Sequence, residues 1–196
     1  MRKNLKSMKV TVLLIILFIQ ITFLAQKPCE YVTNVTDSIG TLKETKSFLI
    51  HEKVFGNSSQ YIFMSLLLDN NSPILNLQII QKSSDFLMPK CLDKNSKIYF
   101  QLSNGKMYTV FSRSPSVCDT FLYNESDKMN NRFLDADFLF VKNDYEDIKK
   151  FPIVMMRIKY ATETTDYILA KELKSERLKE ISSPENLFID NFKCIE

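Results

Sequence analysis

The Asn104-Gly105 dipeptide most restricts how this chain can fold, because it divides two strand-like runs at residues 97–102 and 106–111. Both residues accept the positive φ angles of a two-residue type I′ turn, and Asn-Gly between such runs is a strong hairpin signal. A two-residue loop sets the register and pairs Phe100 with Thr109. The centre of the chain is therefore predicted to be an antiparallel hairpin.

The same register, carried outward along both strands, places Cys91 opposite Cys118. Cys29 and Cys194 remain, and they would join the two ends of the chain that is left after removal of residues 1–25, which have the order of an export signal. An even number of cysteines in such a chain favours disulfides, and without a C-x-x-C spacing a zinc or redox role has little support. We predict the bridges Cys91–Cys118 and Cys29–Cys194; the alternative is four buried thiols.

Residues 1–25 have the order of a secretory signal peptide. A cationic stretch (Arg2, Lys3, Lys6 and Lys9) precedes an apolar run from Val10 to Ala25, which is shorter than the roughly 20 residues of a membrane span. Cleavage is expected after Ala25, although Phe23 stands where a small residue is preferred; an uncleaved signal anchor is the alternative. The protein is thus predicted to be secreted or periplasmic, with no stable membrane span after cleavage.

Removal of the signal peptide reverses the sign of the net charge. Four of the 26 basic residues and none of the 23 acidic ones lie in residues 1–25, so residues 26–196 carry 22 positive and 23 negative side chains. A nearly neutral domain has no overall attraction to phosphate backbones, and we expect no nucleic-acid partner. The length of 26–196 suits a single disulfide-stabilised domain.

The pattern of apolar residues predicts a β-rich α+β fold with a mainly antiparallel sheet. A short helix is expected near 144–150, and a C-terminal helix is expected after Ser183 and Pro184, which suit the cap and the first helical position. Residues 165–181 are compatible with either strand or helix. The expected strands lie at residues 30–35, 41–54, 61–68, 74–81, 97–102, 106–111, 133–141 and 152–160.

Few side chains are suited to catalysis. His51 is the only histidine, and three glycines are too few for a nucleotide-binding loop, so we expect no cofactor and no metal. Asp135 and Asp137 alternate on a predicted strand, where two carboxylates on one face could bind a cation or share a proton. They are the catalytic candidates, with Arg157 as an anion contact; the simpler interpretation is an exposed polar face.

Four segments resemble small secreted proteins of Bacteroidota that have no assigned function: Cys29–Tyr31, Pro152–Tyr160, Thr165–Tyr167 and Pro184–Glu196. The resemblance implies a bacterial periplasmic or secreted location and no reaction. The leading hypothesis is a non-enzymatic extracytoplasmic protein that binds a protein or an envelope component. The alternatives are a hydrolase or transferase using Asp135 and Asp137, and a secreted inhibitor or immunity-type protein.

Overall fold

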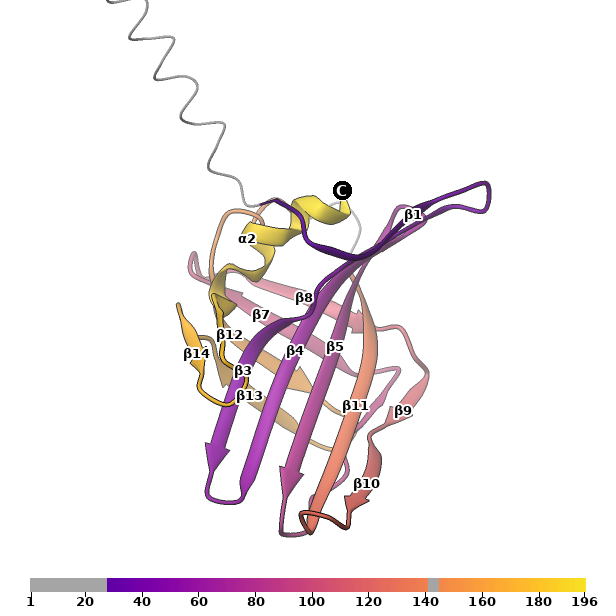
Figure 1. Ribbon diagram of the computed structural model, residues 1–196. Coiled ribbons are helices and arrows are strands. Elements are labelled where there is room, and N and C mark those ends of the chain that lie inside the picture. The colour runs from indigo at the N-terminus through magenta and orange to yellow at the C-terminus, as the bar shows by residue number, and fades with distance from the viewer. Residues whose placement is uncertain (1–27, 141–144) are drawn as a thin grey trace, which may run out of the picture.

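The computed structural model describes residues 28–140 and 145–196, and these form a β-rich, mainly antiparallel fold with a short C-terminal helical segment, as predicted (Figure 1). The predicted signal peptide and residues 141–144 lie outside the described residues. The strands are β1 (Tyr31–Thr36), β2 (Thr41–Thr45), β3 (Phe48–Phe55), β4 (Ser58–Asp69), β5 (Ser72–Ser83), β6 (Cys91–Asp93), β7 (Lys97–Leu102), β8 (Met107–Ser112), β9 (Ser116–Cys118), β10 (Thr120–Asn124), β11 (Met129–Phe140), β12 (Ile153–Lys159), β13 (Thr164–Ile168), β14 (Leu173–Ser175) and β15 (Glu180–Ser182).

One large sheet has the order β1-β2-β4-β5-β11-β8-β7-β12-β13, with β3 also on β4 and β10 also on β11. Strand β11 joins its two halves, since residues 130–139 pair with β5 and residues 138–140 pair with β8. The halves lie one in front of the other in Figure 1, with β3, β4, β5 and β11 as the front layer. The front layer therefore has an inner face on the core and an outer face toward solvent.

Every second side chain along the strands points between the two layers, and these side chains form the core. Ile62, Met64 and Leu66 of β4 are buried, and so are Phe100 of β7 and Met156 of β12. One end of the core is closed by the helical segment, which consists of η1 (Pro184–Asn186), α2 (Leu187–Asn191) and η2 (Phe192–Ile195). Its buried aromatic rings make edge contacts with the core strands: Phe188 with Phe100, and Phe192 with Phe140.

The predicted hairpin is present, but its predicted register is wrong by one residue. Phe100 pairs with Tyr108, not Thr109, because the loop has three residues. Gly105 has φ +83° and donates its N–H to Leu102 O, while Asn104 does not have a positive φ. The Gly105 conformation is that of a three-residue loop ending in a bulge. The shift places the buried side chains of both strands on one face.

Both predicted disulfides are confirmed. Cys91–Cys118 joins β6 and β9, which pair with each other as a separate two-stranded sheet, and Cys29–Cys194 joins the start of the described chain to η2. The Tyr31 hydroxyl donates a hydrogen bond of 2.9 Å to the carbonyl oxygen of Cys194. The N-terminal segment is thus attached to the helical segment by a covalent bond and a hydrogen bond.

Two segments for which the sequence predicted or allowed a helix do not form one. Residues 146–150 form turns instead of the short helix expected near 144–150, although Lys149 and Phe151 donate helix-like hydrogen bonds to Tyr145 and Asp147. The segment 165–181, whose sequence is compatible with strand or helix, forms β13 and the two-stranded hairpin β14–β15. Among the residues that the structure describes, no helix is long and apolar enough to cross a membrane.

Candidate functional site

The outer face of the front layer carries a group of polar side chains at its centre, which we call the polar row: Asn76 and Gln78 of β5 and Asp135 and Asp137 of β11. Asp137 is opposite Asn76, and Asp135 is opposite Gln78. The Asn76 amide donates to Asp135 at 2.7 Å and to Asp137 at 3.1 Å, and the Gln78 amide reaches Asp135 at 3.4 Å. The sequence prediction that the two aspartates lie together is therefore confirmed.

One cation approaches the polar row from its end. Arg113, after β8, lies 3.8 Å from a carboxylate oxygen of Asp137 and 3.4 Å from one of Asp69. Arg113 thus bridges Asp69 and Asp137, while Asp135 forms no ion pair with any of the described residues. This part of the outer face has a local excess of negative charge, although the domain as a whole is nearly neutral.

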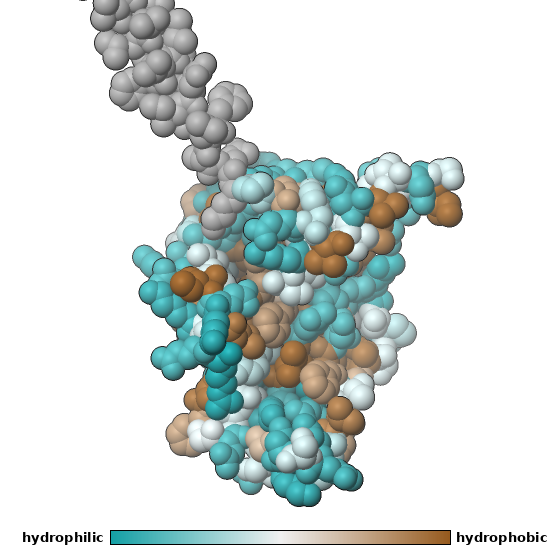
Figure 2. All heavy atoms as spheres, in the orientation of Figure 1, coloured by the Kyte–Doolittle hydropathy of each residue, from teal (hydrophilic) through white to brown (hydrophobic). Residues whose placement is uncertain are grey.

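Two bands of apolar side chains border the polar row. In the strand register, the lower band crosses β4, β5 and β11 as Tyr61, Ile80 and Phe133, and the upper band crosses the same strands as Leu67, Ile74 and Leu139. Phe133 and Leu139 are exposed, and Tyr61 stacks with Phe63 of the same strand. Figure 2 shows hydrophobic side chains above and below a hydrophilic area on this face.

Two buried oxygens in or beside the polar row make no hydrogen bond to any of the described residues: Asn76 Oδ1 and Ser65 Oγ. Ser65 is opposite Asn76 in the β4–β5 pairing, and it is only 1% exposed although it faces outward. A buried polar oxygen without a partner is costly, on the order of 1–3 kcal/mol. The centre of the outer face therefore has unused hydrogen-bonding capacity.

Arg157, the third residue singled out from the sequence, does not join the two aspartates. It lies on β12 in the other half of the sheet and forms a two-pronged ion pair with Asp166 of β13, with hydrogen bonds of 2.5 and 2.6 Å. The hydrogen bond from Arg157 lowers the pKa of Asp166, and the same bond raises the pKa of Arg157. Both carboxylate oxygens of Asp166 are bonded to Arg157 in this exposed cross-strand pair.

His51 has a packing role. Its half-buried ring meets the ring of Tyr167 edge-on, with the centroids 5.0 Å apart, so it connects β3 to β13 across the two layers. Burial lowers the pKa of His51, with a further contribution from the charge of nearby Lys53. The neutral imidazole is thus the favoured form in the folded protein.

We predict that the pH dependence of stability between neutral pH and pH 5 comes in part from His51. The unfolded chain takes up a proton near pH 6.5 while the folded protein resists it, so stability should fall as pH drops through that value and level off below the folded-state pKa. Urea unfolding of wild type and His51→Gln at several pH values measures this. The variant should lose less stability on acidification; an unchanged pH profile would contradict the assignment.

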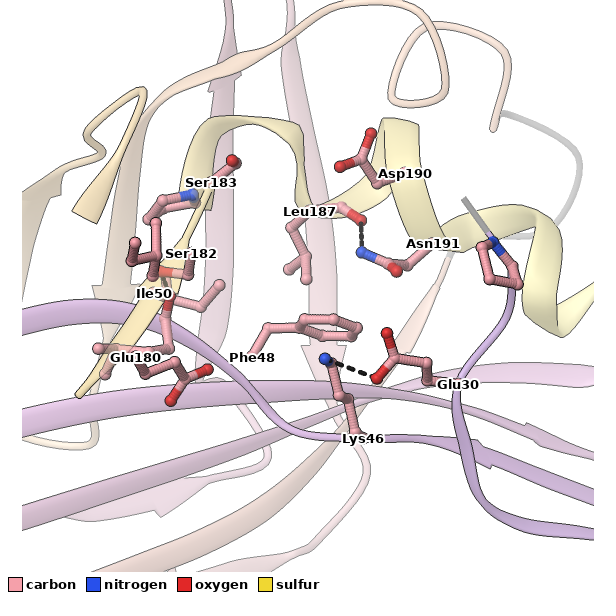
Figure 3. Close-up of a pocket in the computed structure, with 14 residues that line it drawn as sticks. Glu30, Lys46, Phe48, Ile50, Glu180, Ser182, Ser183, Leu187, Asp190 and Asn191 are labelled. Atoms are coloured by element: carbon pink, nitrogen blue, oxygen red, sulfur yellow. Dashed lines mark hydrogen bonds and ion pairs between the residues drawn. The ribbon is translucent and has the colours of Figure 1, made fainter. Parts of the chain in front are cut away.

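A second feature, which the sequence did not reveal, is a pocket between the N-terminal segment, β3, β15 and α2; we call it the terminal pocket (Figure 3). Its volume is about 210 Å³. Figure 3 shows the Leu187 side chain pointing toward the Phe48 ring, with the Lys46–Glu30 ion pair on one side and Glu180 on the other. The Lys46–Glu30 distance is 2.7 Å, and Lys46 Nζ lies 5.6 Å from the Phe48 ring centroid.

No group of three or more histidine, cysteine, aspartate or glutamate side chains suited to a metal ion occurs within residues 28–140 and 145–196. The polar row has two carboxylates and two amides, and the amide nitrogens already point at the carboxylates. In this arrangement the aspartates act as hydrogen-bond acceptors. The row is suited to binding donors or cationic groups from a partner.

Comparisons with known proteins assign no family. No family model matches the chain, and no solved structure matches it. The chain is 28% identical over 173 residues to a structural maintenance of chromosomes protein 3 homolog of Plasmodium falciparum. That match covers 81% of this chain but only 13% of the other protein. At this identity and coverage, the match says nothing about the outer face or the terminal pocket.

Proposed function

We infer that this protein is a non-enzymatic, extracytoplasmic binding protein that docks another protein on the outer face of its front layer. The observation that carries the inference is the polar row with its bordering apolar bands. The two disulfides support an extracytoplasmic location, because such bonds persist in oxidising compartments. The signal-like residues 1–25 support the same location.

The partner is a protein segment that presents a cationic side chain between apolar ones. Among the described residues, Arg113 pairs with Asp69 and Asp137 and no cation pairs with Asp135, so a positive charge is complementary to this area. Exposed Phe133 and Leu139 lie on either side of the polar row along β11. An interface with aromatic and apolar contacts around a few hydrogen-bonded polar groups is typical of protein–protein recognition.

The alternative of a carboxylate-based hydrolase or transferase has less support. Asp135 and Asp137 share one amide donor on the outer face of the sheet, and Arg157 lies in the other half of the molecule. General acid–base pairs work where the two groups have different environments, in a site that holds substrate. The shared environment of these two aspartates favours binding.

The test uses two peptides, Leu-Val-Lys-Val-Leu and Leu-Val-Glu-Val-Leu, blocked at both ends, and the oxidised mature protein labelled for NMR. We expect the lysine peptide to shift the amide signals of β4, β5 and β11, and the glutamate peptide to bind more weakly. Changing Asp135 and Asp137 together to asparagine should reduce the affinity for the lysine peptide about tenfold, since a hydrogen bond to a charged group contributes roughly 1.5–3 kcal/mol.

The matched control is Glu176→Gln, an exposed acid in the β14–β15 turn. It should leave the binding of the lysine peptide unchanged. Equal binding of both peptides, or signal shifts confined to other strands, would contradict the proposed docking surface. A melting curve of the double variant distinguishes lost binding from lost folding.

A further inference from the structure

We propose that the terminal pocket binds a small organic cation, an ammonium group carrying a compact apolar substituent. This site is separate from the outer face and does not depend on the docking proposal. Its walls come from four parts of the chain: residues 28–30, 46–50, 180–184 and 187–191. The pocket therefore exists only in the folded protein.

The charges in the lining point to a cation. Among the described residues that line the pocket, the carboxylates of Glu30 and Glu180 accompany one ammonium, that of Lys46. Glu30 is already paired with Lys46, whereas Glu180 forms no ion pair with any residue in the described parts of the chain. Glu180 is partly buried at the edge of the pocket, so a bound ammonium would meet a carboxylate that has no ion-pair partner among the described residues.

The apolar part of the lining limits the substituent. Phe48 and Leu187 approach each other across the pocket, and Leu187 is only 3% exposed (Figure 3). An aromatic ring attracts a cation to its face, and Lys46 Nζ near the Phe48 ring is an example within this pocket. The volume of about 210 Å³ lies below the roughly 300–1,000 Å³ of pockets for drug-sized ligands, so the ligand is a small molecule.

The pocket is held in shape before any ligand arrives. The Cys29–Cys194 bond ties together two of the wall segments: Cys29 directly follows the lining residue Pro28, and Cys194 comes three residues after the lining residue Asn191. The Ser182 hydroxyl donates to the carbonyl oxygen of Leu49 at 2.7 Å, which fixes β15 against β3, and the Asn191 amide donates to Leu187 O at 2.9 Å. Preorganised walls reduce the entropic cost of binding.

Benzylamine is the probe, with benzyl alcohol and benzoate as neutral and anionic analogues of the same size. Titration of the oxidised mature protein, followed by NMR, should shift the signals of Phe48, Glu180 and Leu187 with benzylamine. Benzyl alcohol and benzoate should bind about tenfold more weakly or not at all, because a charge-assisted contact contributes more than a neutral one.

Glu180→Gln should reduce the affinity for benzylamine about tenfold, by the loss of that charge-assisted contact. Glu172→Gln is the matched control: this exposed acid pairs with Lys174 outside the pocket and should have no effect. Wild-type affinity in Glu180→Gln, or benzoate binding as tight as that of benzylamine, would overturn the proposal. Phe48→Leu keeps an apolar wall but removes the ring. It should reduce the affinity for benzylamine more than the affinity for benzyl alcohol.

Discussion

Changing Cys29 and Cys194 together to alanine should lower the free energy of unfolding by about 5 kcal/mol. The bond spans 165 residues, and in the loop-entropy model a cross-link of this span restricts the unfolded chain strongly. The variant should also lose the attachment of the N-terminal segment to η2, where the Tyr31 hydroxyl meets the carbonyl of Cys194. Urea unfolding of the oxidised protein, with and without the change, measures the difference.

The second disulfide provides the control. Cys91–Cys118 spans only 27 residues, so its removal should cost about 3.5 kcal/mol in the same model. If the Cys29–Cys194 variant loses no more stability than the Cys91–Cys118 variant, the loop-entropy explanation is wrong for this protein. In that case local contacts near the two bonds would determine their effects.

Asp119→Ala should destabilise the fold by about 3–5 kcal/mol, because it leaves Arg132 as an unpaired charge in a buried place. The two side chains are 2% and 11% exposed, and Arg132 Nη1 lies 2.6 Å from Asp119 Oδ1. The other Asp119 oxygen accepts the Lys90 N–H at 2.8 Å, and Arg132 Nε donates to the Leu87 carbonyl at 2.8 Å. This pair therefore connects β11 to the chain on both sides of the Cys91–Cys118 bond.

Two comparisons make the Asp119 prediction specific. Asp127→Ala removes the exposed partner of Lys82 and should cost only about 0–1 kcal/mol. The double change Asp119→Leu and Arg132→Met removes both charges, and it should cost less than Asp119→Ala alone. Both variants lose the hydrogen bond from the Lys90 N–H, so if the double variant is the less stable of the two, the hydrogen bond from Arg132 to the Leu87 carbonyl matters more than the unpaired charge.

The sequence predicted both disulfides although it assigned the hairpin register incorrectly. A two-residue loop at Asn104-Gly105 was the simplest choice, but the observed three-residue loop brings Phe100 opposite Tyr108 on the buried face. The register changes again beyond the hairpin, so that Cys91 is opposite Cys118 after all. Matching the buried faces of both strands, rather than the turn dipeptide alone, would have identified the correct register.

Helix formers at 171–181 do not produce a helix, because this segment packs against β3 as the β14–β15 hairpin. Lys179 takes a left-handed conformation with φ +53° in the turn, and the Ser182 hydroxyl is bonded to Leu49. Such tertiary contacts outweigh intrinsic propensity, which differs by less than about 1 kcal/mol per ordinary residue. The sequence alone contains no comparable signal for this packing.

The candidate sites were predictable to different extents. Alternation on a strand was sufficient to place Asp135 and Asp137 together, since it depends only on local geometry. Their donors Asn76 and Gln78 required the β5–β11 pairing, which joins residues about 60 positions apart. The terminal pocket required the contact of both chain ends with β3 and β15, and no spacing in the sequence indicates that arrangement.

The Cys29–Cys194 bond also determines how the protein responds to mechanical force. Tension applied to the two ends passes through one covalent bond between the terminal segments, so the strands between them carry no load. The 165 residues of chain that separate the cysteines, roughly 550 Å when fully extended, stay out of reach of the pulling force until the bond is reduced. A cut in any loop would likewise leave both fragments covalently joined at their ends.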